Sequence, residues 1–381
     1  MLKEIALLFE KSRSISFVAF ASIVLAACMA TFILWLPFSS AGANQNVLKV
    51  GFLAVGPISD WGWNYSTNQG RLYLEKKLSD RVQTMIAEKI PESAEAERVL
   101  ERMISQGCRL IFTASYGYLE PVIRVASRHP EVTFMQVNRE YSSKNIGTYF
   151  TRLYQPMYLA GIVAGYMTKS NKLGFIAAHP INQILAAINA FTLGAKSVNS
   201  KIETRVIWIN TWSDPPMEAD AVKTLVDNGC DVIAHAQDNQ NTVLRTCEKF
   251  GVYSCGYYTD GHSLAPKGWL TGACQDWGPL FVKITESVIN HTWKPVSYKQ
   301  GLEGGHCKLA DFGQAVPENV RDKVLATENA IKNGNFVIFK GPLKDRDGKL
   351  KLPAGQKADQ HWLNNINFLV SGVQGGLSIT K

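Results

Sequence analysis

The sequence KVGFLA at residues 49–54 returns as KLGFIA at residues 172–177, 123 positions further along the chain. A second pair of segments follows in the same order: an apolar helical pattern precedes Gly107-Cys108, and a similar one precedes Gly229-Cys230 at an offset of 122. Short apolar hexamers match by chance, but two matches at nearly one offset in the same order indicate a duplicated unit. The sequence therefore predicts two similar lobes, which begin near Val47 and Asn171.

Each of the two units alternates short apolar runs with segments of helical periodicity. Ser93 is a fitting cap for a helix that Gly107 ends, and in the second unit Asp214 and Pro215 are a fitting cap and first helical residue. Strands that alternate with helices build parallel sheets covered by helices. The predicted fold class is α/β, with two lobes that are each a doubly wound, mainly parallel sheet. The first strands are expected at residues 47–55, 110–112 and 132–137.

The chain has 381 residues, of which 46% are hydrophobic and 19% are charged, as in globular proteins. One stretch departs from this average, because residues 15–38 carry no charge and basic side chains precede them. Ser39-Ser40-Ala41-Gly42-Ala43 follows this stretch. Residues 1–43 are therefore predicted to be a signal peptide or an N-terminal anchor.

Three outcomes of this export signal are open. Cleavage after the A-x-A of residues 41–43 would free a mature chain that begins at Asn44. Residues 25–28 (LAAC) also fit a lipoprotein box, which would place a lipid on Cys28. An uncleaved anchor is the third outcome, because 24 apolar residues can cross a bilayer core of about 30 Å. Each outcome puts the folded part in the periplasm, outside the cytoplasm.

Charge and cysteine content exclude some classes of protein. Beyond residue 43 the chain keeps an excess of seven basic side chains, but no basic run exceeds two residues, so no nucleic-acid partner is expected.

Six cysteines remain beyond residue 43, without the spacing of a zinc site. Cys247 with Cys255, or Cys274 with Cys307, could form a disulfide. Buried free thiols are the alternative, mainly for Cys108 and Cys230.

The expected ligand site lies where the carboxyl ends of the strands of two lobes face each other. The chain is divided into residues 44–152 (lobe 1, first part), 153–272 (lobe 2, first part) and 273–381 (a crossover back to lobe 1 and a C-terminal segment). Many aromatic residues lie in or beside the loops that follow strands, which indicates a flat ligand held by stacking. They are Trp61, Trp63, Tyr65, Tyr116, Tyr118, Trp212, Tyr258 and Trp277.

Carboxylates accompany these aromatic residues. A carboxylate accepts hydrogen bonds from the amino and ring N–H groups of a base or from sugar hydroxyls. Asp214 is better explained as a helix cap, whereas Asp60 and Asp260 are either turn formers or ligand acceptors. Asp238 follows another strand in the same way.

Catalytic motifs are absent from the sequence. It has no G-x-S-x-G elbow, no phosphate-binding glycine loop and no H-E-x-x-H. His179, His235 and His262 lie in the expected cleft loops, but none has a local partner at ligand spacing. No enzyme activity, cofactor or metal is therefore expected. Residues 345–348 (DRDG) are expected to form a hairpin turn.

Several segments resemble one known family. They are GPISDWGW (56–63), ASYGY (114–118), YLAGIVAG (158–165), NAF (189–191), WSDP (212–215) and GPLKD (341–345). In this order they resemble the basic membrane protein family, which comprises exported substrate-binding proteins of ABC transporters, many of them for purine nucleosides or nucleobases. The resemblance implies a type I periplasmic-binding-protein fold with a ligand cleft between the lobes, an inner-membrane ABC permease as partner, and a monomer.

The resemblance also implies roles for individual residues. Asp60 and Trp63 match the family motif S-x-D-x-G-[FW], in which the Asp binds the base and the aromatic ring borders it. Trp212 is similar to the ring that closes on the base from the second lobe, and Asp260 to the acidic residue that meets a ribose. Where nucleoside-binding members have a lysine for the ribose, this chain has Gln275, which favours a free base such as adenine.

The sequence therefore predicts a solute-binding protein that captures a purine by hinge closure, with Trp63 and Trp212 on the two faces of the ring. Two alternatives are a membrane-anchored solute sensor and a nucleoside-hydrolysing enzyme. The predicted ligand-binding residues are Asp60, Trp63, Tyr116, Trp212, Asp238, Asp260 and Gln275.

Overall fold

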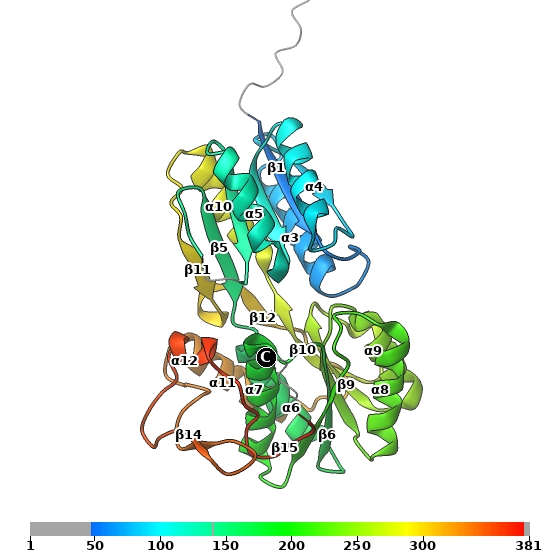
Figure 1. Cartoon of the computed structure of the whole chain (residues 1–381). Helices are drawn as coiled ribbons and strands as arrows, with labels where there is room; N and C mark the ends of the chain where they lie inside the picture. Colours follow the sequence, from blue (N-terminus) through cyan, green and yellow to red (C-terminus); the bar gives the residue numbers. More distant parts are fainter. Residues whose placement is uncertain (1–46, 139–140, 377–381) are drawn as a thin grey trace, which may run out of the picture. The chain divides into compact units, whose positions relative to one another are not determined.

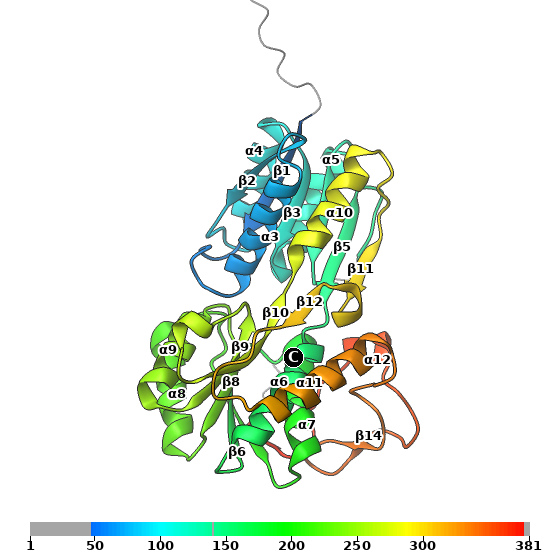
Figure 2. The same cartoon turned by 180° about the vertical axis from the view of Figure 1, so that it is seen from behind.

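A computed structural model describes residues 47–138 and 141–376 of the chain. Within these residues, two sheets of six and seven strands are each covered by helices on both faces (Figures 1 and 2). We call the six-stranded sheet with its helices lobe 1, and the seven-stranded sheet with its helices lobe 2. This architecture confirms the predicted fold class.

Lobe 1 is built on a fully parallel sheet with the strand order β11-β5-β4-β3-β1-β2. Figures 1 and 2 show α4 and α5 on one face of this sheet and α3 and α10 on the other. The strands are β1 (Leu48–Ala54), β2 (Val82–Ala87), β3 (Cys108–Ala114), β4 (Thr133–Val137), β5 (Ile146–Thr151) and β11 (Ser297–Gln300). The helices are α3 (Trp63–Lys77), α4 (Ala94–Ser105), α5 (Leu119–Arg128) and α10 (Trp277–Ile289), with a 3-10 turn at Tyr116–Tyr118.

Lobe 2 has the strand order β12-β10-β9-β8-β6-β7-β15, in which only the pair β10–β12 is antiparallel. The strands are β6 (Lys172–Ala177), β7 (Glu203–Trp208), β8 (Val232–Ala236), β9 (Tyr253–Tyr258), β10 (Trp269–Gln275), β12 (Cys307–Leu309) and β15 (Val373–Gln374). The helices are α6 (Tyr154–Met167), α7 (Asn182–Val198), α8 (Pro215–Asp227), α9 (Gln240–Phe250), α11 (Glu318–Lys332) and α12 (Gln360–Asn364). Short 3-10 turns lie at His262–Leu264 and Leu302–Gly304, and β13 (Leu343–Lys344) pairs with β14 (Leu350–Leu352).

The internal repeat corresponds to equivalent elements of the two lobes. The two matching hexamers lie in β1 and β6, which occupy the same inner position in their sheets. The two predicted helix caps are confirmed: the Ser93 side chain accepts from Glu95 N before α4, and the Asp214 side chain accepts from Met217 N before α8. The turn at residues 345–348 joins β13 to β14 as a hairpin, as predicted.

The chain passes between the lobes three times: from β5 into α6, from β10 into α10, and from β11 into β12. The predicted range 273–381 is thus divided between the lobes, because α10 and β11 belong to lobe 1 and the elements from β12 onward belong to lobe 2.

The predicted signal peptide or anchor at residues 1–43 lies outside the described residues. Of the helices that the structure describes, none is long and apolar enough to cross a membrane.

All six cysteines beyond residue 43 are buried free thiols, so the two possible disulfides are wrong. Cys274 lies opposite Lys308 and Cys307 opposite Gln275, and neighbouring residues of a strand face opposite sides of the sheet. Cys274 and Cys307 therefore point to different faces. Cys255 faces α6, with its sulfur 4.0 Å from the Ala160 carbonyl, whereas Cys247 packs in the core under α8 and α9.

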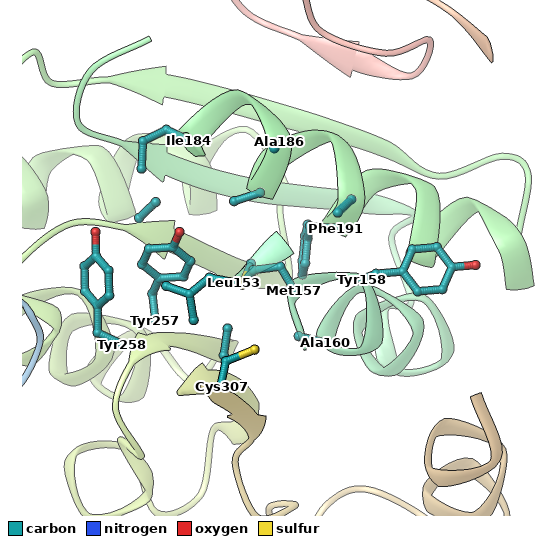
Figure 3. Packing of buried hydrophobic residues seen from close by; sticks show 14 of the residues in the cluster. Leu153, Met157, Tyr158, Ala160, Ile184, Ala186, Phe191, Tyr257, Tyr258 and Cys307 are labelled. Atoms are coloured by element: carbon teal, nitrogen blue, oxygen red, sulfur yellow. The ribbon is translucent and has the colours of Figure 1, made fainter. Parts of the chain in front are cut away.

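Helices α6 and α7 cross in close contact against the sheet of lobe 2, and Figure 3 shows Met157, Ala160 and Phe191 packed there. Two glycines permit this approach. A Cβ on Gly161 would lie 2.0 Å from the Phe191 carbonyl oxygen, and a Cβ on Gly194 would lie 2.0 Å from the Tyr158 carbonyl oxygen. The backbones meet with no room for a methyl group.

We predict that Gly194→Ala lowers the free energy of unfolding by about 1–3 kcal/mol, because the added methyl group forces α6 and α7 apart. At an ordinary helical site the same change stabilises a protein by about 0.5–1 kcal/mol. Urea denaturation measures the difference. Gly376→Ala is the control, since a Cβ there meets no atom within 4 Å, and it should change the stability little. A stabilised Gly194→Ala variant would contradict the prediction.

Candidate functional site

A cavity of about 630 Å³ lies between the lobes and is lined by residues of both. Trp63 and Tyr116 come from lobe 1, and Trp212 comes from lobe 2. Gln275, at the end of β10 where the chain passes to lobe 1, also lines it. Four of the seven predicted site residues are thus brought together in one cavity. Its volume is typical of small-molecule sites, which range from roughly 300 to 1,000 Å³.

Trp63 is the first residue of α3 and is held rigidly at the cavity wall. Its indole Nε1 donates to the Ala114 carbonyl at 2.7 Å, at the end of β3. Its ring meets the Tyr258 ring of lobe 2 edge to face, with centroids 5.1 Å apart. The hydrogen bond to the sheet of lobe 1 and the ring contact to lobe 2 fix the orientation of this indole.

Tyr257 and Tyr258 both line the cavity from the end of β9. Consecutive residues of a regular strand point to opposite faces, but Tyr258 has a φ of 77°, which ends the alternation. The two rings lie 4.3 Å apart between centroids, and Figure 3 shows their hydroxyls on the same side. Tyr258 is one of the aromatic residues that the sequence analysis placed near the loops. Tyr257 was not predicted, because in a regular strand its side chain would point to the opposite face from that of Tyr258.

Trp212 lies in the loop between β7 and α8 and contacts the ring of His179, with centroids 4.9 Å apart. Burial lowers the pKa of His179, and the nearby Glu92 carboxylate opposes this effect. The imidazole is therefore neutral near pH 7 and packs as an aromatic ring. Asp238 N donates to the Trp212 carbonyl at 2.9 Å, which ties this loop to the end of β8.

Gln275 presents a fixed amide. Its Oε1 accepts from Trp277 Nε1 at 3.0 Å and from the Ser66 hydroxyl. An indole nitrogen can only donate, so the atom facing it must be the amide oxygen. The Nε2 group makes no hydrogen bond with the described residues and is the donor that Gln275 can offer to a ligand.

Asp60 lies beside the cavity and does not line it. Its Oδ1 accepts from the backbone N–H groups of Gly62 and Tyr65, and its Oδ2 from the backbone and side-chain nitrogens of Asn64, all at 2.7–2.9 Å. Burial raises the pKa of Asp60, and these hydrogen bonds oppose the rise. The carboxylate is fully occupied by its own turn, which favours the turn-forming alternative over the ligand acceptor.

Asp238 and Asp260 are also separated from the cavity wall. Asp238 is buried, and burial together with the carboxylates of Asp60, Glu218 and Glu92 raises its pKa well above the ordinary value. Asp260 borders a second cavity of about 610 Å³, and its Oδ1 accepts from His262 N at 2.8 Å. Gln275 lines both cavities.

The sequence missed part of the cavity wall. Gln183, at the start of α7, lines the cavity, and its Oε1 is buried without a hydrogen-bond partner. Gln183 directly follows the loop after β6, and its place after a strand could have identified it as a candidate site residue. Gln360 and Leu363 of α12 also line it, but nothing in their local sequence indicates a return of the C-terminal segment to the cleft.

The donor groups of the site suit an organic ligand. Among residues 47–138 and 141–376, no group of three His, Cys, Asp or Glu side chains could hold a metal ion. His235 is fully buried, and burial lowers its pKa to about 3, so it is a neutral core residue. The arrangement can hold a planar solute through aromatic contacts and neutral amides.

The chain is similar to proteins of a known family. Residues 47–340 match the Bmp family model, described as ABC transporter substrate-binding protein PnrA-like. A purine-binding protein of Brucella abortus is 37% identical over 337 residues, which cover 88% of this chain and 96% of that protein. A candidate ABC transporter glucose-binding protein of Haloferax volcanii is 30% identical, over 87% of this chain and 82% of that protein.

A solved structure supports the fold. It is an ABC transporter solute-binding protein from Conexibacter woesei, with a TM-score of 0.65 and 20% sequence identity. The match covers 76% of this chain and 98% of that one. The two-lobed α/β architecture is thus that of periplasmic binding proteins.

We predict that Glu218, a buried acidic residue of α8, makes stability depend on pH. Burial raises the pKa of Glu218 from 4.5 to about 7, while its Oε1 accepts from Asp214 N at 3.1 Å. The folded state thus binds the Glu218 proton more tightly, so the stability that Glu218 contributes is present below pH 4.5 and is lost as pH rises to about 7. The buried His235, whose pKa is lowered to about 3, acts in the opposite sense, so the effect of Glu218 is read as a difference between variant and wild type. The contribution of Glu218 is ~3 kcal/mol.

Chemical denaturation between pH 4 and 8 checks this prediction. Glu218→Gln keeps an acceptor for Asp214 N but cannot titrate, so its stability relative to that of the wild type should rise as pH rises over this range. Asp220→Asn, at an exposed site of the same helix, is the control and should keep the wild-type slope. Equal slopes for the wild type and Glu218→Gln would refute the buried-acid interpretation.

Proposed function

The chain belongs to the Bmp family of ABC transporter substrate-binding proteins, the PnrA-like proteins, and from this premise we propose that it captures a purine base, with adenine favoured. The single observation that carries the proposal is that aromatic rings of both lobes line one cavity. Trp63 and Tyr116 approach from lobe 1 and Trp212 from lobe 2. Stacking on aromatic side chains stabilises a bound base by roughly 1–3 kcal/mol.

The polar groups of the cavity complement the edge of adenine. Gln275 offers the Nε2 donor, and Gln183 also lines the cavity with a side-chain amide. Adenine carries ring nitrogens that accept and an amino group that donates. The purine-binding relative from Brucella abortus supports the same ligand class.

A free base is favoured over a nucleoside for two reasons. Gln275 stands where similar nucleoside-binding proteins have a lysine for the ribose. Asp260, the residue that resembles their ribose-binding carboxylate, borders the second cavity and does not line the first. The proposed ligand contacts are therefore Trp63, Tyr116, Trp212 and Gln275, while Asp60 and Asp238 support the loops behind them.

The proposed mechanism is hinge closure. A base stacked on one lobe supplies contacts to the other, so the closed state binds it more tightly than the open state. The protein then delivers the base unchanged to an inner-membrane ABC permease, as a monomer. Proteins of this family act outside the cytoplasm, and the apolar segment at residues 15–38 would direct export, with or without a lipid on Cys28.

A sugar is the second candidate ligand. The Haloferax volcanii relative is a candidate glucose-binding protein, and sugars also pack on tryptophan rings. We favour the purine because aromatic rings from both lobes suit the two faces of a flat heterocycle.

We predict that adenine raises the melting temperature and quenches or shifts tryptophan fluorescence, whereas glucose does neither. A ligand at 100 times its Kd stabilises the folded state by about 2.7 kcal/mol. Trp212→Ala should weaken adenine binding and reduce the fluorescence response, leaving the part that comes from Trp63, whereas Trp293→Phe, outside the cavity, should retain the full response. Guanine, hypoxanthine, adenosine and inosine complete the panel. No response to any purine would refute the ligand, and release of base from a nucleoside would reveal an enzyme.

We also predict that Gln275→Leu weakens adenine binding by about 10-fold, because the Nε2 donor is lost. Gln275→Glu keeps an acceptor for Trp277 Nε1 and Ser66 but has no donor, so it should weaken binding at least as much. Calorimetric titration measures both variants. Unchanged binding by Gln275→Glu would show that the amide does not contact the ligand.

A further inference from the structure

We propose that Gln240 is the centre of an interlobe latch, a set of direct protein–protein hydrogen bonds that favours the closed arrangement before any ligand is bound. The latch consists of the turn at residues 60–65 of lobe 1 and of Asp238, Gln240 and Thr259 of lobe 2. None of the three lobe 2 residues lines the 630 Å³ cavity. The latch therefore acts on the lobe equilibrium and not on the ligand itself.

The contact is made by the backbone of lobe 1. The carbonyl of Trp61 accepts from Gln240 Nε2 at 2.7 Å and from the Thr259 hydroxyl. The next hydrogen bond runs from Trp63 N to the Asp238 carbonyl at 3.3 Å. A Cβ on Gly62 would lie 1.9 Å from the same Asp238 oxygen, so the two main chains touch where only glycine fits.

Lobe 2 holds its part of the latch ready. Gln240 is fully buried at the start of α9, where its Oε1 accepts from Tyr257 N at 3.3 Å. Its Nε2 also donates to Thr259 Oγ1 at 2.6 Å. These partners belong to lobe 2, so the amide keeps its orientation when lobe 1 moves away. Little side-chain ordering is therefore needed on closure.

Lobe 1 holds the other part with equal rigidity. Trp61 has a φ of 57°, an uncommon conformation for a residue other than glycine, and this turn directs its carbonyl to lobe 2. Asp60 stabilises the turn through its four hydrogen bonds to Gly62, Asn64 and Tyr65. The role of Asp60 is thereby explained without any contact to a ligand.

The latch is coupled to the cavity through Trp63. This residue donates its backbone N–H to the latch and presents its indole to the cavity beside Tyr258. When the latch opens, the Trp63–Tyr258 contact between the lobes is lost as well. Ligand affinity is reduced by the fraction of molecules in which the binding arrangement is absent, so a stronger latch gives tighter binding.

Small-angle X-ray scattering of the ligand-free protein tests the latch. Gln240→Leu fills the same space without hydrogen bonds, and we expect it to raise the radius of gyration, because more molecules are open. Thr259→Val removes the second side-chain bond to Trp61 and should act in the same direction. Asn145→Ala is the matched control: its Nδ2 donates to three carbonyls, those of Ala126, His129 and Val132, all within lobe 1.

The control should lower the melting temperature and leave the radius of gyration unchanged. An unchanged radius in both Gln240→Leu and Thr259→Val would overturn the proposal, as would an equal increase in Asn145→Ala. If Gln240→Leu does not fold, Thr259→Val decides alone.

Adenine titration adds a second readout, which rests on the proposed function. Gln240→Leu should weaken adenine binding about 3- to 10-fold, the range expected for one hydrogen bond, and Asn145→Ala should not. If no variant binds adenine but the scattering differs as expected, the ligand assignment fails and the latch stands. Tighter or equal adenine binding by an expanded Gln240→Leu variant would refute the coupling.

Discussion

The carboxylate of Asp60 is the constraint on which the binding region depends. Four donors from residues 62–65 surround it, and together they hold a turn that its own backbone preferences would not favour. Through this turn one acidic residue sets the direction of the Trp61 carbonyl and the start of α3. The position of the Trp63 ring at the cavity wall follows from both. A residue that touches no solute can thus determine how the solute is held.

The two sheets provide the rigid frame behind this turn. Parallel strands covered on both faces must be apolar on both, and β1 shows this: Phe52 packs in one core and its neighbour Leu53 in another. Within the described residues only three connections join the lobes. Rigid lobes with few connections favour movement of one lobe against the other, with little deformation inside either.

The fold could be predicted from the sequence because its signals are local and occur twice. The hexamers in β1 and β6 and the caps Ser93 and Asp214 depend on neighbouring residues alone. The site was predicted only in part. Trp63 and Trp212 follow from their places after strands, but whether a loop carboxylate faces a ligand or its own backbone depends on hydrogen bonds that no spacing reveals. The predicted disulfides were wrong for a similar reason, because the sequence does not reveal on which side of the sheet each thiol lies.

The end of the described chain affects solubility. β15 pairs with the outer strand β7 through Val373 and Gln374, and Asn189 anchors the segment before it by bonds to Phe368 O and Val370 N. An unpaired strand at the rim of a sheet exposes a row of amide groups that can recruit another chain. β7 ends in three consecutive apolar residues, Val206, Ile207 and Trp208, which would suit such growth. β15 therefore covers the rim at Thr204 and Arg205 and shortens the row of amide groups that another chain could pair with.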